Sequence, residues 1–300
     1  MWRLGIVDFD SSHCVEFTRR FNHAGLDRDQ YVDGARVVAG SSTESLMSPE
    51  RIPGHLAELR SIGIDMVDHP EDLLGRIDAV LILSICGSAH LSRVRPFLEA
   101  GIPAFVDKPF ACSLPDALEM VRLAEQHNVL LMSSSGMRFA DEALLIQQHQ
   151  QSFGPVLGAV TFGPAKRADG NPGLFHYGIH SVELLLQLLG PGCESVRTTY
   201  SDGAEVVTAQ WTDGRIGTVR GNRHGSTAYG YVAFCERGVI PQLVSTRNSY
   251  RNLLRAFVQS LDSRTPAVPP SSSLEVVRFI LASLRSEQTA GSVVRLDEVG

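Results

Sequence analysis

The first 134 residues alternate between short apolar stretches and stretches with helical periodicity, and this alternation constrains the fold more than any other feature. The apolar stretches, which predict strands, cover residues 4–7, 35–40, 65–67, 79–83, 103–106 and 129–132. Helical patterns lie between them, at 15–24, about 56–62 and 88–100, and from Leu114 onward. Strands that are apolar on both faces and alternate with helices are typical of a parallel, doubly wound sheet. We therefore expect an α/β domain over residues 1–134.

A different pattern follows from about residue 135. Strand-like segments joined by Asp-Gly turn signals cover 156–162, 205–211 and 216–220, and one apolar helix covers about 179–189. This pattern predicts an α+β domain over residues 135–300 with an open, mainly antiparallel sheet. After a connector rich in proline and serine, Ser272-Ser273-Leu274-Glu275 predicts a capping box. It would begin a final helix over about 273–287, which we expect to pack back on the N-terminal domain.

The charge and cysteine content narrow the classes of function. A formal net charge of −6 and a pI near 5.9 disfavour nucleic acid and anionic membranes as partners. No apolar run has transmembrane length, and the N-terminus runs into a strand without the pattern of a signal peptide. The five cysteines are scattered and form no CxxC pair, which indicates reduced thiols in the cytoplasm. A small molecule is therefore the expected partner.

The turn after the first strand reads Asp8-Phe9-Asp10-Ser11-Ser12-His13. Dinucleotide-binding folds carry a GxGxxG sequence here, and its glycine positions are filled in this chain by Asp8, Asp10 and His13. The N-terminus of the next helix still offers N–H groups and a positive dipole end to a phosphate. As alternatives, Asp10, Ser11 or Ser12 caps that helix, or the two acids and His13 bind a metal. The spacing does not support the metal, and we expect none.

The second strand is followed by Ser41-Ser42-Thr43, where NAD-dependent folds usually place an acid for the ribose hydroxyls. Small hydroxyl side chains suit a 2′-phosphate better than a bare diol, with Arg51 as a further partner. The pattern therefore favours NADP slightly over NAD. An ordinary polar loop is the alternative.

The predicted strand 103–106 leads into Asp107-Lys108-Pro109. A lysine at the carboxyl end of a parallel strand points into the crevice where open α/β sheets bind ligands. Proline restricts the residue before it, so the ammonium group is held in place. Lys108 is therefore a candidate for chemistry, and a solvated lysine in an ordinary loop is the alternative.

His176, His180 and Glu183 stand four and three residues apart at the start of the apolar helix of the second domain. If the helix extends that far, all three share one face, and Glu183 can orient His180 from one turn away. Imidazole titrates near neutral pH, which suits proton exchange with a hydroxyl or carbonyl. The alternatives are histidines that cap or pack the helix start, and a zinc site, for which no further ligand cluster is evident.

Taken in this order, the motifs resemble the glucose–fructose oxidoreductase/inositol dehydrogenase (Gfo/Idh/MocA) family. The resemblance runs nearly end to end: 78–82 with His90, Gly101-Ile102-Pro103, Asp107-Lys108-Pro109, Gly136-Met137-Arg138-Phe139 and 176–183. Asp107 stands where the family has glutamate in its Glu-Lys-Pro motif, and His176 stands where it has aspartate. Because its glycine positions are also filled, the chain is identified as a divergent member.

The resemblance implies a Rossmann domain joined to an open-sheet domain that often mediates dimerisation. It implies hydride transfer between a nicotinamide ring and a secondary alcohol or ketone of a sugar, cyclitol or similar cyclic substrate. Lys108 would hydrogen-bond the reacting oxygen, His180 would exchange the proton and His176 would assist. Arg138, Tyr177 and Glu183 would contact the substrate. The residues expected to line the NADP or NAD site are Asp8, Phe9, Asp10, Ser11, Ser12, His13, Ser41, Ser42, Ser84, His90, Asp107 and Lys108.

Other functions stay open at this point. The filled glycine positions favour a redox-neutral lyase, isomerase or cyclase that uses Lys108 and the histidines, or a sugar-binding protein without chemistry. A metal-dependent hydrolase built on the histidines is a third class. Specificity would come from polar side chains at strand ends, for which the candidates are Lys166, Arg167, Arg220, Asn222, Arg223 and His224. An exposed sheet face makes a homodimer the expected oligomer.

Overall fold

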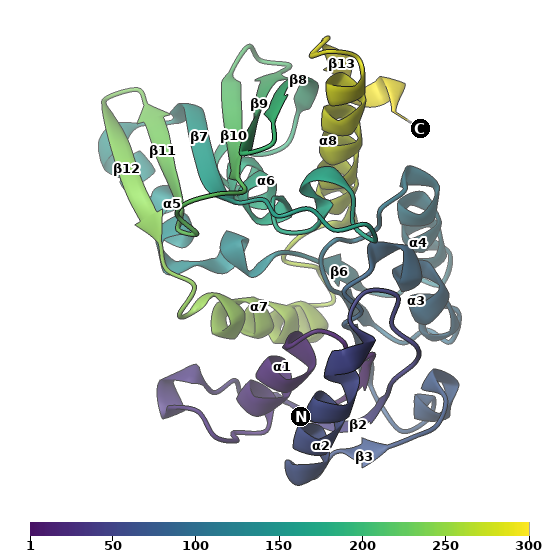
Figure 1. Cartoon of the computed structure of the whole chain (residues 1–300). Coiled ribbons are helices and arrows are strands. Elements are labelled where there is room, and N and C mark those ends of the chain that lie inside the picture. Colours follow the sequence, from purple (N-terminus) through teal and green to yellow (C-terminus); the bar gives the residue numbers. More distant parts are fainter. Residues whose placement is uncertain (300) are drawn as a thin grey trace. The chain divides into compact units, whose positions relative to one another are not determined.

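The computed structural model describes residues 1–299, and the side chains of all of these except 147–151. By its internal contacts the chain forms two units. Unit 1 comprises Met1–Ala111, Pro115–Ser134 and Tyr250–Pro270, and unit 2 comprises Cys112–Leu114, Ser135–Ser249 and the segment from Ser271 onward. Figure 1 labels their helices and strands.

Unit 1 is built on a six-stranded sheet in the order β3-β2-β1-β4-β5-β6, and all neighbouring strands are parallel. The strands are β1 (Trp2–Val7), β2 (Ala35–Ser41), β3 (Asp65–Met66), β4 (Ala79–Ile82), β5 (Ala104–Val106) and β6 (Leu131–Ser133). β4 and β5 are buried along their whole length, as their apolar side chains require. The expected parallel, doubly wound sheet is confirmed. Its order reverses between β1 and β4, the kind of switch point where open α/β sheets bind ligands.

A late segment of the chain completes the core of unit 1. The helices are α1 (His13–Phe21), α2 (Ile52–Ser61), α3 (His90–Glu99), α4 (Leu114–Gln126) and α7 (Ser249–Ser263), with the short 3₁₀ helices η1 (Arg28–Gln30), η2 (Pro49–Arg51), η3 (Pro70–Leu73) and η4 (Gly87–Ala89). The sequence analysis does not single out α7. Its residues Leu254 and Phe257 are nonetheless buried. The Phe257 ring meets the ring of Phe105 on β5 edge-on, with centroids 5.6 Å apart.

Unit 2 contains a seven-stranded sheet in the order β12-β11-β7-β10-β9-β8-β13. The strands are β7 (Val156–Pro164), β8 (Cys193–Ser201), β9 (Ala204–Trp211), β10 (Ile216–Asn222), β11 (Tyr229–Cys235), β12 (Gly238–Val244) and β13 (Val294–Arg295). β7 and β10 are parallel, and every other neighbouring pair is antiparallel. The expected open, mainly antiparallel sheet is confirmed.

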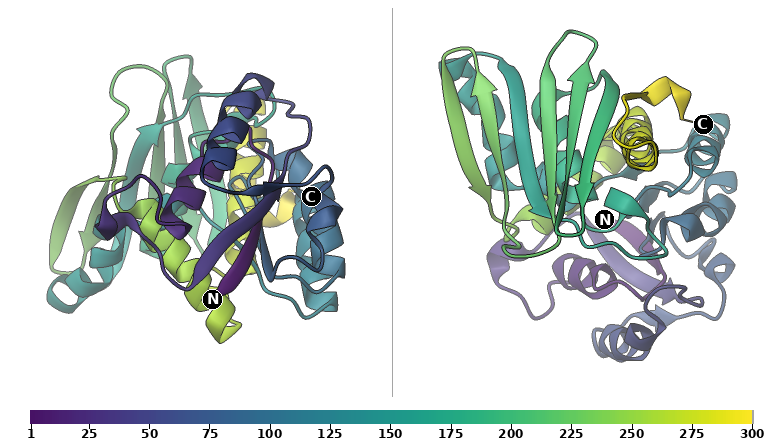
Figure 2. Two further views of the ribbon diagram at one scale, coloured as in Figure 1. Left: turned by 90° about the horizontal axis from the view of Figure 1, so that it is seen from below. Right: turned by 45° about the horizontal axis from the view of Figure 1, so that its top comes forward.

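Helices cover one face of this second sheet. They are α5 (Asp141–Phe153), α6 (Ile179–Leu189) and α8 (Pro270–Gln288), with the 3₁₀ helices η5 (Gly136–Phe139), η6 (Gly173–Phe175) and η7 (Leu296–Glu298). The apolar helix α6 packs on β7, where Thr161 Oγ1 donates a hydrogen bond of 2.9 Å to the carbonyl of Ser181. The opposite face of the sheet is turned toward the viewer in the right-hand view of Figure 2.

The strands β8, β11 and β12 are not among the sequence-based expectations. β12 contains Pro241, which argues against a central strand because proline cannot donate to a ladder. In the structure β12 stands at the edge of the sheet, where proline is tolerated. Pro241 therefore weakens the sequence pattern of β12 but does not prevent the strand from forming.

The predicted capping box of the final helix is wrong. α8 begins at Pro270, so Ser272–Glu275 lies inside the helix rather than at its start. The Glu275 carboxylate accepts hydrogen bonds of 2.8 and 2.7 Å from the backbone N–H groups of Gly192 and Cys193. α8 also contacts β8, where Thr198 Oγ1 donates to the carbonyl of Ser283. By these contacts α8 belongs to unit 2.

Candidate functional site

Asp8, at the first glycine position of the β1–α1 turn, is held inside unit 1. Its backbone has φ 69°, in the left-handed region that glycine adopts freely and aspartate tolerates. One carboxylate oxygen accepts hydrogen bonds from the backbone N–H and the hydroxyl of Thr43, at 2.9 and 2.6 Å. The other accepts from Ser84 Oγ at 2.5 Å and pairs with Arg93 Nε at 3.2 Å. Only 4% of Asp8 is exposed. Its hydrogen bonds join the carboxyl end of β1 to residues that follow β2 and β4.

Asp10, at the second glycine position, makes a similar connection. Its carboxylate accepts from Ser45 Oγ at 2.6 Å and from the backbone N–H of Ile85 at 3.1 Å. Burial raises the pKa of Asp10 above its ordinary value and the Asp8 charge adds to the rise, although the two donors oppose it. The carboxylate oxygens of both acids thus accept hydrogen bonds from groups outside α1.

His13, at the third glycine position, forms a buried cluster with Asp107 and Tyr250. Its Nδ1 lies 2.6 Å from Asp107 Oδ2, and its Nε2 lies 2.9 Å from the Tyr250 hydroxyl. The imidazole also stacks on the ring of Phe17. Burial alone would raise the pKa of Asp107, but His13 and Lys108 hold it below its ordinary value. Asp107 is therefore a charged group that is fixed in place directly before Lys108.

Ser11 and Ser12 stand at the N-terminus of α1. Ser11 Oγ accepts from the backbone N–H of His13 at 3.2 Å. Ser12 is the N-cap residue, is exposed, and makes no capping hydrogen bond with its side chain. Of the three residues expected as possible caps, Ser11 thus accepts from the first turn of α1, whereas Ser12 does not. Among the described residues the Ser12 hydroxyl has no hydrogen-bond partner at the positive end of the helix.

Other residues predicted for the cofactor have structural partners. Ser41 is buried and its hydroxyl donates to the carbonyl of Asp68 at 3.4 Å, and Ser42 donates to the carbonyl of Thr43. His90 is buried, with Nε2 2.8 Å from the carbonyl of Ser84. Phe9 is buried too, and its carbonyl lies 2.7 Å from His55 Nδ1. Phe9 and His90 thus belong to the core of unit 1, and their place in the nucleotide site stays a prediction.

Lys108 follows β5 at the carboxyl end of the sheet of unit 1. It is partly exposed, and its peptide bond to Pro109 is cis. Within the part of unit 1 that the structure describes, the ammonium group makes no hydrogen bond or ion pair. A cation in this state is available to a ligand oxygen.

His180, near the start of α6, is oriented by a residue that the sequence analysis missed. Its Nδ1 lies 2.6 Å from Ser135 Oγ. The same hydroxyl oxygen caps η5 by accepting from the backbone N–H of Met137 at 3.1 Å. Ser135 is fully buried. A serine has no charge or ligand spacing in the sequence that would mark it, so only its contact with His180 reveals it.

Glu183 is committed to a buried ion pair rather than to His180. Its Oε2 accepts from Arg138 Nε, and its Oε1 accepts from the backbone N–H of Ser135 at 3.2 Å. The expected orientation of His180 by Glu183 is thus wrong in its direct form, because Ser135 stands between them. Arg138 is buried as well, and among the described residues its Nη2 atom has no hydrogen-bond partner. The two N–H groups of this nitrogen are therefore buried without an acceptor among the described residues.

His176 does not share the helical face of His180. α6 begins at Ile179, and His176 lies before it, at the end of η6. Its ring meets the Tyr177 ring edge-on, with centroids 4.7 Å apart. Tyr177 is 42% exposed, and its ring centroid lies 6.2 Å from that of His180. The tyrosine therefore links the two histidines on the surface of unit 2.

A pocket of about 410 Å³ opens beside these aromatic rings in unit 2. Tyr177 and Tyr229 line it together with four of the predicted specificity residues, Lys166, Asn222, Arg223 and His224. The other two candidates lie outside it: Arg167 pairs with Glu205 and Glu287, and Arg220 donates to Asn222. Its volume is in the range of small-molecule sites.

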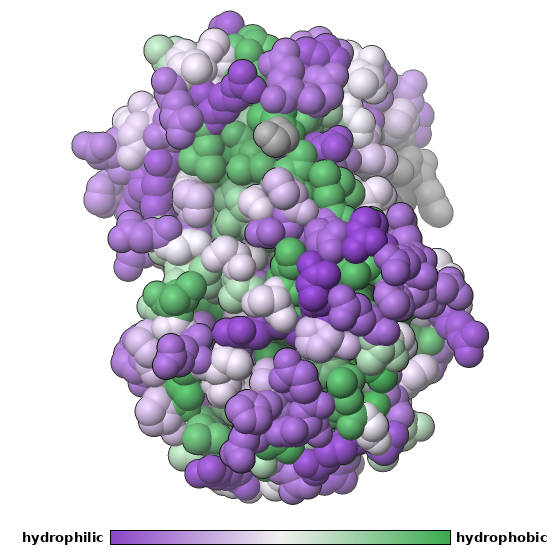
Figure 3. Space-filling model, turned by 90° about the vertical axis from the view of Figure 1, so that its right-hand side faces the viewer, coloured by the Kyte–Doolittle hydropathy of each residue, from purple (hydrophilic) through white to green (hydrophobic). Residues whose placement is uncertain are grey.

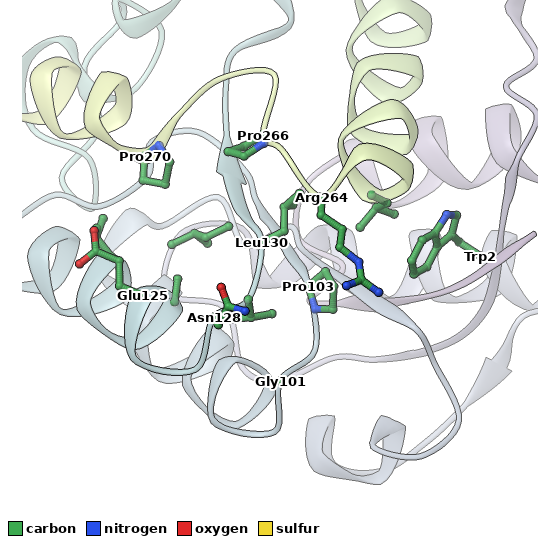
Figure 4. Close-up of a pocket in the computed structure, with 14 residues that line it drawn as sticks. Trp2, Gly101, Pro103, Glu125, Asn128, Leu130, Arg264, Pro266 and Pro270 are labelled. Atoms are coloured by element: carbon green, nitrogen blue, oxygen red, sulfur yellow. The ribbon is translucent and has the colours of Figure 1, made fainter.

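Unit 1 has a pocket of its own, of about 500 Å³. Trp2, Pro103, Leu130 and Arg264 are among its lining residues, and Figure 4 shows them around the hollow. Trp2, Pro103 and Leu130 stand at or directly before the first residues of β1, β5 and β6. The pocket therefore lies at the opposite strand ends from Asp8, Ser84 and Lys108, away from the switch-point crevice.

Two comparisons with known proteins bear on the family. Residues 37–135 match the profile of an oxidoreductase family with an NAD-binding Rossmann fold, GFO_IDH_MocA. A Salmonella typhimurium protein named "putative oxidoreductase YceM" is 37% identical over 116 residues. Over residues 37–135 the chain is similar to the Gfo/Idh/MocA oxidoreductase family. The match covers 39% of this chain and only 37% of the length of the Salmonella protein.

Solved structures share the fold of this chain over nearly its full length. A probable dehydrogenase from Thermotoga maritima has a TM-score of 0.81 at 17% identity and covers 99% of this chain and 100% of its own. A myo-inositol dehydrogenase from Lactobacillus casei, in complex with NAD(H) and myo-inositol, has a TM-score of 0.80 at 16% identity and covers 98% and 96%. The two folds, a Rossmann unit and an open-sheet unit, are thus shared at low identity.

Other kinds of site find little support. Among residues 1–299, no group of three or more His, Cys, Asp and Glu side chains is arranged to hold a metal ion. No described helix is long and apolar enough to cross a membrane. Hydrophilic residues spread widely over the face shown in Figure 3.

Proposed function

We propose that this chain is a member of the Gfo/Idh/MocA family and an NAD(H)-dependent oxidoreductase. It would interconvert a secondary alcohol and a ketone on a sugar, cyclitol or similar small cyclic substrate. The observation that carries the proposal is the ammonium of Lys108, which has no partner within unit 1 and follows β5 at the ligand-binding end of a Rossmann sheet. The family profile and the fold of the NAD(H)-bound Lactobacillus casei enzyme support it.

The residues of the first turn fit a dinucleotide at the helix end. Ser12 and the N-terminus of α1 offer an exposed hydroxyl and a positive dipole to a phosphate. Asp8 and Asp10, which would repel the phosphate, point to partners outside α1, and Asp8 is paired with Arg93. The missing glycines make the approach of the pyrophosphate to the backbone less close than in a GxGxxG turn. When bound, the nicotinamide ring would accept or donate the hydride.

We infer NAD(H) rather than NADP(H), in place of the slight preference for NADP that the sequence suggests. The hydroxyls of Ser41 and Thr43, expected for a 2′-phosphate, are bonded to Asp68 and Asp8. A buried carboxylate beside Thr43 would also repel a further phosphate. Both effects act against the phosphorylated form of the cofactor.

Lys108 and His180 would carry separate parts of the chemistry. Lys108 would donate a hydrogen bond to the reacting oxygen and stabilise negative charge on it. His180 would exchange the hydroxyl proton, with Ser135 holding Nδ1 so that Nε2 is the exchanging atom. His176 would assist through Tyr177, and the buried Nη2 of Arg138, which has no hydrogen-bond partner among the described residues, would bind a substrate hydroxyl.

We also propose a homodimer in the cytoplasm. Val239, Phe234 and Ile216 are exposed on the outer face of the second sheet, in one row across β12, β11, β7 and β10. A second copy would cover such a face. The five cysteines are free, as in a reducing compartment. Light scattering of wild type and Phe234→Glu tests the dimer, because the charge should yield a monomer that retains its fold.

Titration with NADH and NADPH, followed by a turnover assay on a panel of cyclitols and sugars, tests the activity. We expect sub-millimolar binding of NADH and weaker binding of NADPH. Lys108→Met should abolish turnover while NADH affinity and the unfolding transition stay close to wild type. Turnover that survives this substitution would contradict the assignment of Lys108.

One observation favours a second function. The carboxylates of Asp8 and Asp10 accept hydrogen bonds from residues that follow β2 and β4, at the carboxyl ends of the strands. This favours a redox-neutral lyase or isomerase that uses Lys108 and His180 without a nucleotide. The same titration separates the two functions. Binding of neither NADH nor NADPH would support the second one.

A further inference from the structure

Several of the side chains that line the pocket of unit 2 can donate hydrogen bonds. Asn222 Oδ1 already accepts from Arg220 Nε at 3.0 Å, so the amide N–H₂ of Asn222 is left to donate. Ser226 Oγ accepts from the backbone N–H of Ala228, and its O–H is likewise left to donate. Lys166 is exposed, and among the described residues its ammonium has no hydrogen bond or ion pair. None of the described residues that line the pocket is Asp or Glu.

A fixed arginine and an aromatic wall give this pocket its shape. Arg223 donates to Glu205 at 2.6 Å and to the carbonyls of Asp202 and Ser201, so its guanidinium is held in place. Tyr229 meets the ring of His180 edge-on, with centroids 5.6 Å apart. Gly163 on β7 makes room for that tyrosine, since a side chain there would collide with the Tyr229 ring. The pocket is thus continuous with the surroundings of His180.

The use of lysine in this chain points to the same place. Lys108 and Lys166 are the only two lysines in the sequence, and all other basic side chains counted with them are arginines. Lysine presents a compact, strongly hydrated charge with three donors on a flexible stem, whereas arginine presents a planar fork. One of the two lysines follows β5 and the other lines the pocket. An anionic oxygen is the natural partner for an otherwise unpaired ammonium.

We propose that this pocket binds an anionic group, and that the substrate is a sugar or cyclitol ring that carries a carboxylate or a phosphate. Lys166 supplies the charge, and the amide of Asn222 and the hydroxyls of Ser226 and Tyr177 donate to the remaining oxygens. The ring itself would then lie against Tyr229, toward His180. The substrate class rests on the proposed oxidoreductase function, but binding of the anion to the pocket is measurable without turnover.

Titration of the full chain with four probes tests the proposal: glucuronate, glucose 6-phosphate, glucose and myo-inositol at constant ionic strength. Reductive methylation with ¹³C-formaldehyde labels Lys108, Lys166 and the N-terminus and keeps their charge, so that NMR reports on Lys166 by itself. We expect at least one anionic probe to shift the Lys166 signal and to bind about tenfold or more tightly than glucose. The two anionic probes distinguish a carboxylate site from a phosphate site.

Lys166→Met and Arg197→Met form a matched pair of variants. Both remove one exposed positive charge from unit 2, but Arg197 lies on β8 outside the pocket. Lys166→Met should weaken binding of the anionic probe about tenfold or more and leave binding of myo-inositol unchanged, whereas Arg197→Met should change neither. Equal effects of the two variants, or no preference for anions, would overturn the proposal. Because no nucleotide is present, that result would leave the NADH titration unaffected.

Discussion

Ser135 Oγ lies 2.6 Å from His180 Nδ1, and the same oxygen accepts the backbone N–H of Met137 at 3.1 Å. One buried hydroxyl thereby connects the 3₁₀ helix after β6 to the imidazole at the start of α6. The buried pair of Glu183 and Arg138 supports this connection, because Glu183 also accepts from the backbone N–H of Ser135. The orientation of His180 thus depends on Glu183, one helical turn away, and on Ser135 and Arg138, which are distant in sequence.

Ser135→Ala should release His180 without removing it. The methyl group cannot bond Nδ1, so we expect the imidazole to populate both tautomers and the turnover rate to fall about 10- to 100-fold. ¹⁵N NMR of the His180 ring measures the tautomers directly, and the pH profile of kcat/KM reports the consequence. Ser135→Thr keeps the hydroxyl and should restore both. Unchanged ring shifts in Ser135→Ala would contradict the role of this serine.

Asp8→Gly should lower the stability of the protein and raise its affinity for the nucleotide. The backbone at φ 69° suits glycine, but Thr43 and Ser84 lose their acceptor and Arg93 loses its ion pair. We expect the free energy of unfolding to fall by about 1–3 kcal/mol and NADH to bind severalfold more tightly, about tenfold at most. Urea unfolding and calorimetry measure the two effects. Asp8→Asn, which removes the charge but keeps the volume, should show a smaller gain, and a loss of affinity in both variants would refute the explanation.

Breaking the buried pair of Arg138 and Glu183 should be costly. Arg138→Met and Glu183→Gln each leave one buried group uncompensated, which typically lowers stability by about 3–5 kcal/mol. The double variant should lose less than the sum of the single losses, because it leaves no unpaired charge. Urea unfolding of the four proteins gives the coupling energy. As a control, Arg295→Met removes an exposed pair with Glu194 and should cost far less. Additive losses would show that the two side chains do not interact.

Asp107 should make unit 1 sensitive to acid. Its pKa is lowered in the folded state, so the stability it contributes is present above the ordinary aspartate pKa of about 3.9 and is lost as pH falls through the lowered folded value. Asp107→Asn should therefore be less stable than wild type at neutral pH, by about 1–3 kcal/mol, and the difference should shrink in acid. Asp78→Asn is a matched control, since the pKa of Asp78 is also lowered but its carboxylate is partly exposed. A difference that stays constant with pH would contradict this assignment.

Much of the fold follows from local pattern. The strands β4 and β5 and the helix α6 can be recognised in the sequence. A strand that is buried on both faces gives a continuous apolar run, and a helix that is buried along one stripe gives a helical period. The strand β12 and the helix α7 are harder to recognise in the sequence. Pro241 masks an edge strand, and α7 follows the strands of unit 2 in the sequence although it packs in the core of unit 1.

The sequence by itself determines the resemblance to the family, the two kinds of sheet and the places of Lys108 and His180 in the chain, since each depends on residue type and order. Only the tertiary structure decides which groups those side chains meet. It assigns Ser135 rather than Glu183 to His180, and it turns Asp8 and Asp10 toward partners more than 30 residues away. Hydrogen bonds between distant segments have no sequence period, because their partners are brought together by packing of whole strands and helices. The filled glycine positions can be read in the sequence, but their consequence for the nucleotide depends on those contacts.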